Sequence, residues 1–389
     1  MAKKKKIAVI FGTRPDTIKL APIILELKKR TAHFKVVTIA TAQHRQMLDQ
    51  VLEVFKIKPD HDLNIMEPRQ TLATITKNTI EALDGILEME KPDLVLVQGD
   101  TTTTFVGSLA AFFRHIPVGH VEAGLRTNNK AHPFPEEINR RLTSCIADLH
   151  FAPTSAARRA LLREHVDPRS VFVTGNSVID ALNISVKARY RFSREDLNKI
   201  VAMQRRILLI TMHRRENLGE PMRGAAMAIR RLASMFPDCE VIFPVHLNPR
   251  VREVVYPVLS RIPNVHLVEP MDYSGFVNLM AKSYLILTDS GGVQEEGPAL
   301  GKPVLVLREV TERPEAVEYG TAKLVGLNEE KIVNTARKLM ENSRAYNEMA
   351  RATNPYGDGR AARRTVGIII RYFGLSRALV KEFRPGISV

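Results

Sequence analysis

The chain has 389 residues, 44% of them hydrophobic, so it is too long for one compact core and fits two domains. Its two cysteines lie far apart, which excludes a disulfide framework, and no apolar run approaches the roughly 20 residues that span a bilayer. The net charge of +15 would suit a nucleic acid, an anionic membrane or an acidic small ligand. Because the basic residues are spread along the chain and aromatic residues are few, we expect no nucleic-acid partner. A soluble cytoplasmic protein is the simplest expectation.

The first predicted strand, 7–11, runs into the turn Gly12-Thr13-Arg14-Pro15. Pro15 suits the first turn of a helix, and Pro22 should kink that helix or end its first segment. Arg14 and Lys19 would then lie near the carboxyl end of a strand, where open α/β sheets bind ligands. The alternative for Arg14 is an ordinary surface charge.

The next two predicted strands, 35–40 and 93–97, also end in polar residues. Gln43, His44 and Gln46 follow the first of them and suit either a polar ligand or a solvated helix start. Asp100 follows the second, after a predicted helix over 71–89. It is either the N-cap of a helix over 103–114 or a carboxylate of a site.

Two further acidic residues follow the predicted strand 117–121. Glu122 comes directly after it, and Glu136 opens a helix that also carries Arg140. An acidic residue in a first helical turn is good helix chemistry without any function. However, Asp100, Glu122 and Glu136 all follow strands, or the loops after them, in a sheet predicted to be parallel. Clustered carboxylates of this kind are what general acid/base chemistry needs.

The alternation of predicted strands and helices continues with strands over 149–152 and 171–174. A predicted linker over 175–193 follows, and the alternation resumes with a strand over 207–211. This alternation predicts parallel sheets in an α/β fold. His213 and Arg214 follow the strand 207–211, and His246 follows the strand 241–244. A lone histidine is more often a structural hydrogen-bonding group, but His213 follows a strand as Asp100 and Glu122 do.

The stretch 285–313 predicts a nucleotide site. A strand over 285–288 leads into Ser290, Gly291 and Gly292, then a short helix and a strand over 304–307. Unpaired amides at a helix start favour a phosphate, and Glu295 or Glu296 on the next turn would suit the hydroxyls of a ribose. The alternative is a structural glycine-rich turn. Helical patterns over 329–350 and from 360 to the end should pack back across a domain, which makes the first domain discontinuous.

Taken together, these motifs resemble those of the non-hydrolysing UDP-N-acetylglucosamine 2-epimerases over essentially the whole chain. The matching stretches are GTRPDTIKLAP, QHRQML, VQGDTTTT, HVEAGLRT, PFPEEINR, TGNSVIDAL, TMHRREN, TDSGGVQEEGPALGKPVLVLRE and TERPEAV. One departure is Asp16, where the family usually has Glu, which puts any contact of that residue with the loop or ligand in question.

The resemblance implies two Rossmann-like domains facing a cleft, as in the glycosyltransferase-B fold, with the C-terminal helix crossing back to the first domain. We expect these domains at 1–176 plus about 363–389, and at 177–362. The family interconverts UDP-GlcNAc and UDP-ManNAc by eliminating UDP to 2-acetamidoglucal and adding it back. It works as a cytoplasmic homodimer with neither NAD nor a required metal.

The resemblance also assigns roles to residues of this chain. Catalytic positions match Asp100, Glu122, Glu136, Arg140 and His213. Positions that hold UDP match Arg14, Phe276, Ser290, Gly291, Gly292, Glu296 and Arg313, to which we add Lys19. A second, activating UDP-GlcNAc would contact Gln43, His44, Gln46, Arg69, Arg214 and His246. The rival readings are a hydrolysing epimerase that releases ManNAc and UDP, and a nucleotide-sugar glycosyltransferase.

Overall fold

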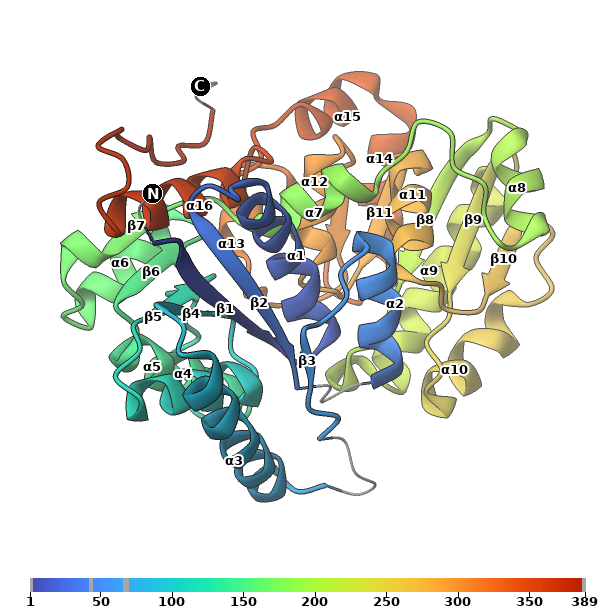
Figure 1. Cartoon of the computed structure of the whole chain (residues 1–389). Coiled ribbons are helices and arrows are strands. Elements are labelled where there is room, and N and C mark those ends of the chain that lie inside the picture. The colour runs from blue at the N-terminus through green and yellow to red at the C-terminus, as the bar shows by residue number, and fades with distance from the viewer. Residues whose placement is uncertain (1–2, 42–44, 66–69, 387–389) are drawn as a thin grey trace. The chain divides into compact units, whose positions relative to one another are not determined.

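The computed structural model describes residues 3–41, 45–65 and 70–386, without the side chains of 45–47 and 215. Within these ranges the chain forms two compact α/β units. Unit 1 comprises Met1–Ile184 and Tyr356–Arg384, and unit 2 comprises Ser185–Pro355 and Pro385–Val389. Each unit is built on one parallel sheet flanked by helices (Figure 1). The predicted α/β class with two parallel sheets is confirmed.

In unit 1 the sheet has the order β3-β2-β1-β4-β5-β6-β7. Its strands are β1 (Lys5–Phe11), β2 (Phe34–Ala40), β3 (His61–Asp62), β4 (Leu94–Gln98), β5 (Val118–Val121), β6 (Leu149–Ala152) and β7 (Val171–Val173). Its helices are α1 (Arg14–Lys29), α2 (Arg45–Phe55), α3 (Leu72–Glu90), α4 (Thr102–Phe113), α5 (Glu136–Ile146), α6 (Ser155–Arg163), η1 (Pro168–Ser170), α7 (Ser177–Ser185) and α16 (Ala361–Tyr372). The central strands β1 and β4 are almost wholly buried, as their continuous apolar runs require when helices cover both faces.

In unit 2 the sheet has the order β10-β9-β8-β11-β12-β13. Its strands are β8 (Arg206–Thr211), β9 (Cys239–Pro244), β10 (Val265–Val268), β11 (Leu285–Thr288), β12 (Val304–Val306) and β13 (Ala322–Leu324). Its helices are α8 (Glu195–Ala202), η2 (Arg215–Asn217), α9 (Glu220–Met235), α10 (Pro249–Leu259), α11 (Tyr273–Lys282), α12 (Val293–Ala299), α13 (Pro314–Glu318), α14 (Glu329–Glu341) and α15 (Ser343–Ala350).

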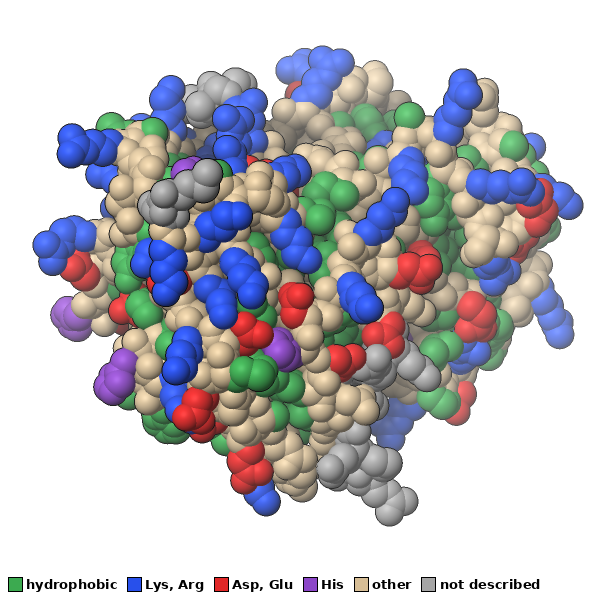
Figure 2. Space-filling view, viewed as in Figure 1, with side chains coloured by type: hydrophobic (Ala, Val, Ile, Leu, Met, Phe, Trp, Pro, Cys, Tyr) green, Lys and Arg blue, Asp and Glu red, His purple; other side chains and the backbone are tan. Residues whose placement is uncertain are grey.

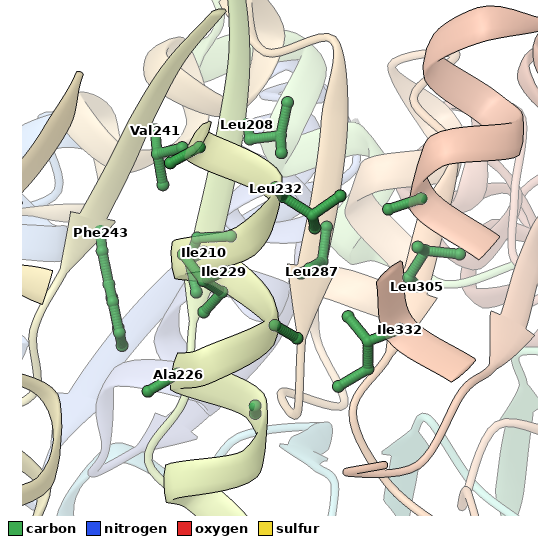
Figure 3. Packing of buried hydrophobic residues seen from close by; sticks show 14 of the residues in the cluster. Leu208, Ile210, Ala226, Ile229, Leu232, Val241, Phe243, Leu287, Leu305 and Ile332 are labelled. Atoms are coloured by element: carbon green, nitrogen blue, oxygen red, sulfur yellow. The ribbon is translucent and has the colours of Figure 1, made fainter. Parts of the chain in front are cut away.

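The core of unit 2 lies between its sheet and the helices α9 and α14. Figure 3 shows Ile229 and Leu232 of α9 and Ile332 of α14 facing side chains of the sheet strands. These side chains are at most 1% exposed. Burying an aliphatic side chain of this size contributes about 1.5–3 kcal/mol relative to leaving it in water. The loops after the strands are therefore anchored on a rigid base.

Four local predictions were wrong in detail. The helix α1 runs through Pro22, so of the two alternatives for Pro22, the end of a helical segment is wrong. The predicted linker contains α7, in which Val178, Ile179 and Leu182 are buried. The helical pattern over 329–350 is two helices, because Asn342 caps α15. The last helix, α16, ends at Tyr372 and does not continue to the chain end, since Gly374 adopts a left-handed conformation with φ of 67°.

The helix α16 belongs to unit 1, where it packs against α1. The prediction that the C-terminal helix returns to the first domain is therefore confirmed. In the described part of the chain, no helix combines the length and the apolar character needed to cross a membrane.

Candidate functional site

The strand orders locate one ligand-binding edge in each unit. In unit 1 the sheet is extended in opposite directions from the neighbours β1 and β4, and in unit 2 from β8 and β11. Ligands of doubly wound sheets bind beyond the carboxyl ends of the strands at such a switch point. The loops after β1 and β4 carry Arg14 and Asp100. The loops after β8 and β11 carry His213 and the turn at Ser290.

The loop after β1 is held by Asp16. Its carboxylate accepts hydrogen bonds from the amides of Thr13 at 2.8 Å and Gly12 at 3.1 Å. Burial raises the pKa of Asp16 to about 6, while these amide bonds act in the opposite direction. A Cβ on Gly12 would lie 2.1 Å from the hydroxyl oxygen of Thr41, so only glycine fits there. The aspartate thus makes the contact with the loop that presents Arg14.

Asp100 is not a helix cap. Thr101 caps α4, with its hydroxyl accepting the amide of Thr104 at 3.2 Å. The Asp100 carboxylate instead pairs with the guanidinium of Arg140. The backbone carbonyl of Asp100 accepts the side-chain amide of Asn139 at 3.0 Å. Burial raises the pKa of Asp100, with Arg140 opposing the shift and the Glu122 charge adding to it. Of the two alternatives, the capping role is wrong.

Glu122 lies at the centre of the unit 1 group. Its backbone is left-handed, with φ of 62°, and the residue is 7% exposed. A non-glycine residue in this conformation costs of order 1–3 kcal/mol, and such strained positions are enriched at functional sites. The carboxylate accepts the Lys19 ammonium at 2.6 Å and the Asn176 amide at 3.1 Å, and it also accepts the Gln98 amide. Lys19, which we predicted to bind UDP, therefore forms an ion pair with Glu122 in this structure.

Sequence reasoning missed Gln98 and Asn176. Gln98 ends β4, and Asn176 lies three residues after β7, within the stretches VQGD and TGNS. Their position at strand ends was the available signal.

The helix α5 contributes the remaining predicted residues of unit 1. Glu136 opens the helix, and Arg140 lies one turn later on the same face. Glu137 between them accepts the amides of Thr127 at 3.0 Å and Asn128 at 3.1 Å, so it is a structural carboxylate that closes the preceding loop. Asp100, Glu122 and Arg140 are thereby brought together with Lys19.

The centre of the unit 2 group is Asp289, which sequence reasoning passed over. Its buried carboxylate accepts the amides of His213 and Arg214, both at 2.9 Å, and the side-chain amide of Asn217 at 3.1 Å. A charged acceptor with three donors fixes the geometry of both loops strongly. Asp289 thus ties the loop after β8 to the loop after β11.

His213 lies beside Asp289, with 3.2 Å between its Nδ1 and a carboxylate oxygen. The ring stacks on His246, with ring centroids 5.8 Å apart. Its side chain is 41% exposed, so one edge remains open to a ligand. Desolvation by the surrounding protein lowers the pKa of His213, and the Asp289 charge opposes that shift.

The glycine-rich turn precedes α12 as predicted, with Gly292 at the N-cap position. The amide of Ser290 already donates to the Thr288 hydroxyl at 2.9 Å. A phosphate at this turn would therefore depend on the amides of Gly291 and Gly292. A Cβ built on Gly291 would meet no atom closer than 3.8 Å, so the backbone there can be approached.

Two carboxylates follow this turn and have different partners. Glu295 pairs with the guanidinium of Arg313. Glu296 accepts the Tyr273 hydroxyl at 2.9 Å, and Phe276 lies one turn further along the same helix, α11. Glu295 and Glu296 were the two candidates for binding the ribose hydroxyls. Of these, Glu296 is the one that contacts α11, which carries Tyr273 and Phe276.

A family model described as UDP-N-acetylglucosamine 2-epimerase matches residues 26–370. The chain belongs to this epimerase family. The UDP-N-acetylglucosamine 2-epimerase of Bacillus subtilis is 56% identical over 381 residues, which cover 98% of this chain and 99% of the relative. The resemblance inferred from the motifs is confirmed.

Solved structures agree with this membership. The UDP-GlcNAc 2-epimerase of Neisseria meningitidis, crystallised with UDP-GlcNAc, is 50% identical with a TM-score of 0.85, over 94% of this chain and 100% of that one. A Staphylococcus aureus protein solved with UDP is 48% identical with a TM-score of 0.87, over 98% of this chain and 100% of that one.

The epimerase residues that we predicted to bind an activator are described only in part. Gln43, His44 and Arg69 lie outside the described residues, and Gln46 is described only as backbone of α2. In unit 2, Arg214 lies 3.5 Å from Glu312, and His246 stacks on His213. Of the predicted activator-binding residues, His246 therefore lies beside His213, which we predicted to be catalytic.

Proposed function

We propose that this epimerase converts UDP-GlcNAc reversibly to UDP-ManNAc without hydrolysing it. The observation that carries the proposal is the partly buried group of Asp100, Glu122, Lys19 and Arg140 at the switch point of unit 1. A glycosyltransferase would need one acid or base at most near the sugar. Two interacting carboxylates, one with a raised pKa, suit the exchange of protons at one carbon.

The chemistry sets the order of steps. The proton on carbon 2 is not next to a carbonyl, so direct deprotonation has no enolate to form. Cleavage of the bond between carbon 1 and UDP makes this proton acidic. Loss of the proton and UDP gives 2-acetamidoglucal. Addition of a proton to the other face of carbon 2 and of UDP to carbon 1 completes the epimerisation.

In this proposal unit 2 holds the leaving UDP. The amides of Gly291 and Gly292 and the Arg313 guanidinium would take the diphosphate, with Ser290 beside them, and Arg14 of unit 1 would add a second cation. Glu296 and Phe276 would contact the nucleoside. His213 would donate to the phosphate as it departs. Oriented donors that meet developing charge stabilise such a transition state.

Unit 1 would supply the proton transfers. We assign the two faces of carbon 2 to Asp100 and Glu136, with Glu122 as an acid/base or sugar-positioning partner. The raised pKa of Asp100, caused by burial, supports its assignment, because a general acid/base works best when its pKa lies closer to the operating pH than that of a free carboxyl. Arg140 would restrain Asp100, and Lys19 would restrain Glu122.

The proposal includes a second UDP-GlcNAc as activator, bound by Gln43, His44, Gln46, Arg69, Arg214 and His246. The stacking of His246 on His213 supports a direct route from that ligand to the catalytic histidine. It also includes a cytoplasmic homodimer with domains divided near residue 176, as the family resemblance implies. Sedimentation of the purified protein would test the dimer.

Product analysis tests the proposed function. Purified protein incubated with UDP-GlcNAc should give a mixture of the two UDP-linked sugars, resolved by ³¹P NMR or ion-exchange chromatography, with no accumulation of free UDP. Starting from UDP-ManNAc should reach the same ratio. Free ManNAc with an equal amount of UDP would instead identify a hydrolysing epimerase.

A further inference from the structure

The excess positive charge of the chain comes from two segments far apart in sequence. Residues 1–35 contain ten Lys and Arg against two Asp and Glu, and residues 356–384 contain seven against two. These segments hold 13 of the 15 net charges. A UDP site needs only a few cations, so the proposed function leaves most of this charge unexplained.

The fold brings the two segments together at the amino-terminal edge of the unit 1 sheet. The helices α1 and α16 pack against each other, and the ammonium of Lys5 lies 5.2 Å from the ring centroid of Phe373. The amide of Lys5 also bonds to the carbonyl of His33, just before β2. Figure 2 shows Lys and Arg side chains crowded over this part of unit 1, where Figure 1 draws the start of β1 and α16.

Part of this charge is neutralised within the protein. Lys5 pairs with Asp93, Lys6 with Glu90, and Arg30 with Glu26. Other exposed cations of these segments have no acidic partner within ion-pair distance among the described residues, and six of them lie at this edge of the sheet. We call them the basic face: Lys3, Lys4, Lys28, Lys35, Arg371 and Arg377.

A groove that is lined in part by apolar side chains adjoins the basic face. Its volume is about 560 Å³, and its lining includes Leu149, Phe172, Ile368 and Val380. Arg371 and Tyr372 also line it. Its two acids are engaged, since Asp148 accepts the amide of Val118 at 2.8 Å and Asp167 pairs with Arg169.

Beside Val380, Leu379 is 79% exposed, and Tyr372 is 43% exposed. Cations surrounding exposed aliphatic and aromatic side chains are what an anionic lipid surface recognises, with the phosphates on the cations and the apolar side chains in the acyl boundary.

We propose that the basic face docks on a membrane that contains anionic phospholipid. A nucleic acid would use the cations but not the apolar groove. A second copy of the chain in a face-to-face dimer would bring like charges together. The lipid surface uses both features of the face.

The docked orientation leaves the proposed catalytic group accessible. The basic face and the groove lie where β1, β6 and β7 begin, whereas Asp100 and Glu122 follow the ends of β4 and β5. In a parallel sheet these are opposite edges. Membrane attachment should therefore leave the turnover of soluble UDP-GlcNAc unchanged.

The test is co-sedimentation of the full chain with vesicles of phosphatidylcholine alone or mixed with phosphatidylglycerol. We expect binding only to the mixed vesicles, weakening as salt rises because the Debye length shortens. The variant K28Q/R371Q/R377Q should lose on the order of 100-fold in partition coefficient, since each juxtamembrane cation contributes a factor of about five.

The matched control is R261Q/K323Q/R337Q, which removes three exposed cations from unit 2 and should bind as the wild type does. Leu379→Ser should weaken binding several-fold, whereas Met203→Ser, at another exposed apolar residue, should not. Retained turnover of UDP-GlcNAc shows that each variant is folded.

Three results would overturn the proposal. These are equal binding to both kinds of vesicle, equal losses in the two triple variants, and binding of a DNA or RNA oligonucleotide under conditions where vesicles are not bound.

Discussion

The Glu122 carboxylate is held by one ammonium and two carboxamides, from Lys19, Gln98 and Asn176. Such an arrangement fixes the carboxylate in one position and spends part of the folding free energy on a left-handed backbone. The Glu137 carboxylate accepts two backbone amides of the preceding loop and also pairs with Arg140 and Arg141. Of these two carboxylates, Glu122 alone stands on a left-handed backbone, which supports a role for Glu122 toward a ligand.

Glu122→Gln should therefore lower kcat by roughly 100-fold or more, as the loss of a general acid or base does. Binding of UDP, measured by calorimetry, should remain within a few-fold of the wild type, because the UDP-holding residues lie elsewhere. Glu81→Gln, at an exposed glutamate of the same unit, is the control and should be fully active. Turnover within a few-fold of wild type would remove Glu122 from the catalytic group.

His213 provides a prediction of pH dependence. Its pKa is lowered in the free protein by desolvation. A diphosphate beside the ring would favour the imidazolium, so UDP should raise the pKa of His213 and bind more weakly as pH rises through that pKa. NMR titration of the ring with and without UDP measures this.

Asp289→Asn offers the companion measurement. It removes a charge that favours the imidazolium, so the pKa of His213 should fall further in this variant. An unchanged His213 pKa on adding UDP would argue against contact with the phosphate.

At the scale of elements, α1 begins just after β1 in unit 1, and α12 begins just after β11 in unit 2. The α1 start depends on Asp16, a carboxylate 1% exposed whose pKa is about 6. Its folded pKa lies above the unfolded value, so the folded state binds the proton more tightly. The stability that this residue contributes is present at low pH and is lost as pH rises from about 4 to about 6.

Asp16→Asn removes this titration. Relative to wild type, the free energy of unfolding of the variant should therefore rise by about 2 kcal/mol between pH 4 and pH 6. Urea denaturation at several pH values measures the difference. A difference between the two proteins that does not change with pH would contradict the assignment of the raised pKa to Asp16.

Strands and strand-end residues were predictable from sequence, and helix ends were less so. The strands 149–152 and 285–288 were predicted to the residue, because buried strands are short apolar runs bounded by polar turns. The break at Asn342 was missed, since the apolar spacing continues across it while the cap depends on one side-chain bond. Sequence alone left Asp100 open between a helix cap and a carboxylate of a site, because Asp and Thr are both good caps and Thr101 directly follows Asp100.

At the scale of the whole molecule, the motifs identified the residues but not their partners. Asp289, Gln98 and Asn176 act through contacts with residues 24 to 76 positions away. Such pairings arise only when parallel strands bring their carboxyl ends to one edge. The charge was misleading in the same way. Basic residues that looked evenly spread in sequence form one face, because α1 packs on α16.

The central claim is that carbon 2 of a UDP-linked sugar loses and regains its proton while UDP is released and recaptured. NMR of UDP-GlcNAc incubated with the pure protein in deuterium oxide tests it most directly. We expect deuterium to appear at carbon 2 of both UDP-GlcNAc and UDP-ManNAc as the two approach equilibrium. Epimer formation without deuterium at carbon 2, or deuterium only in free ManNAc, would contradict it.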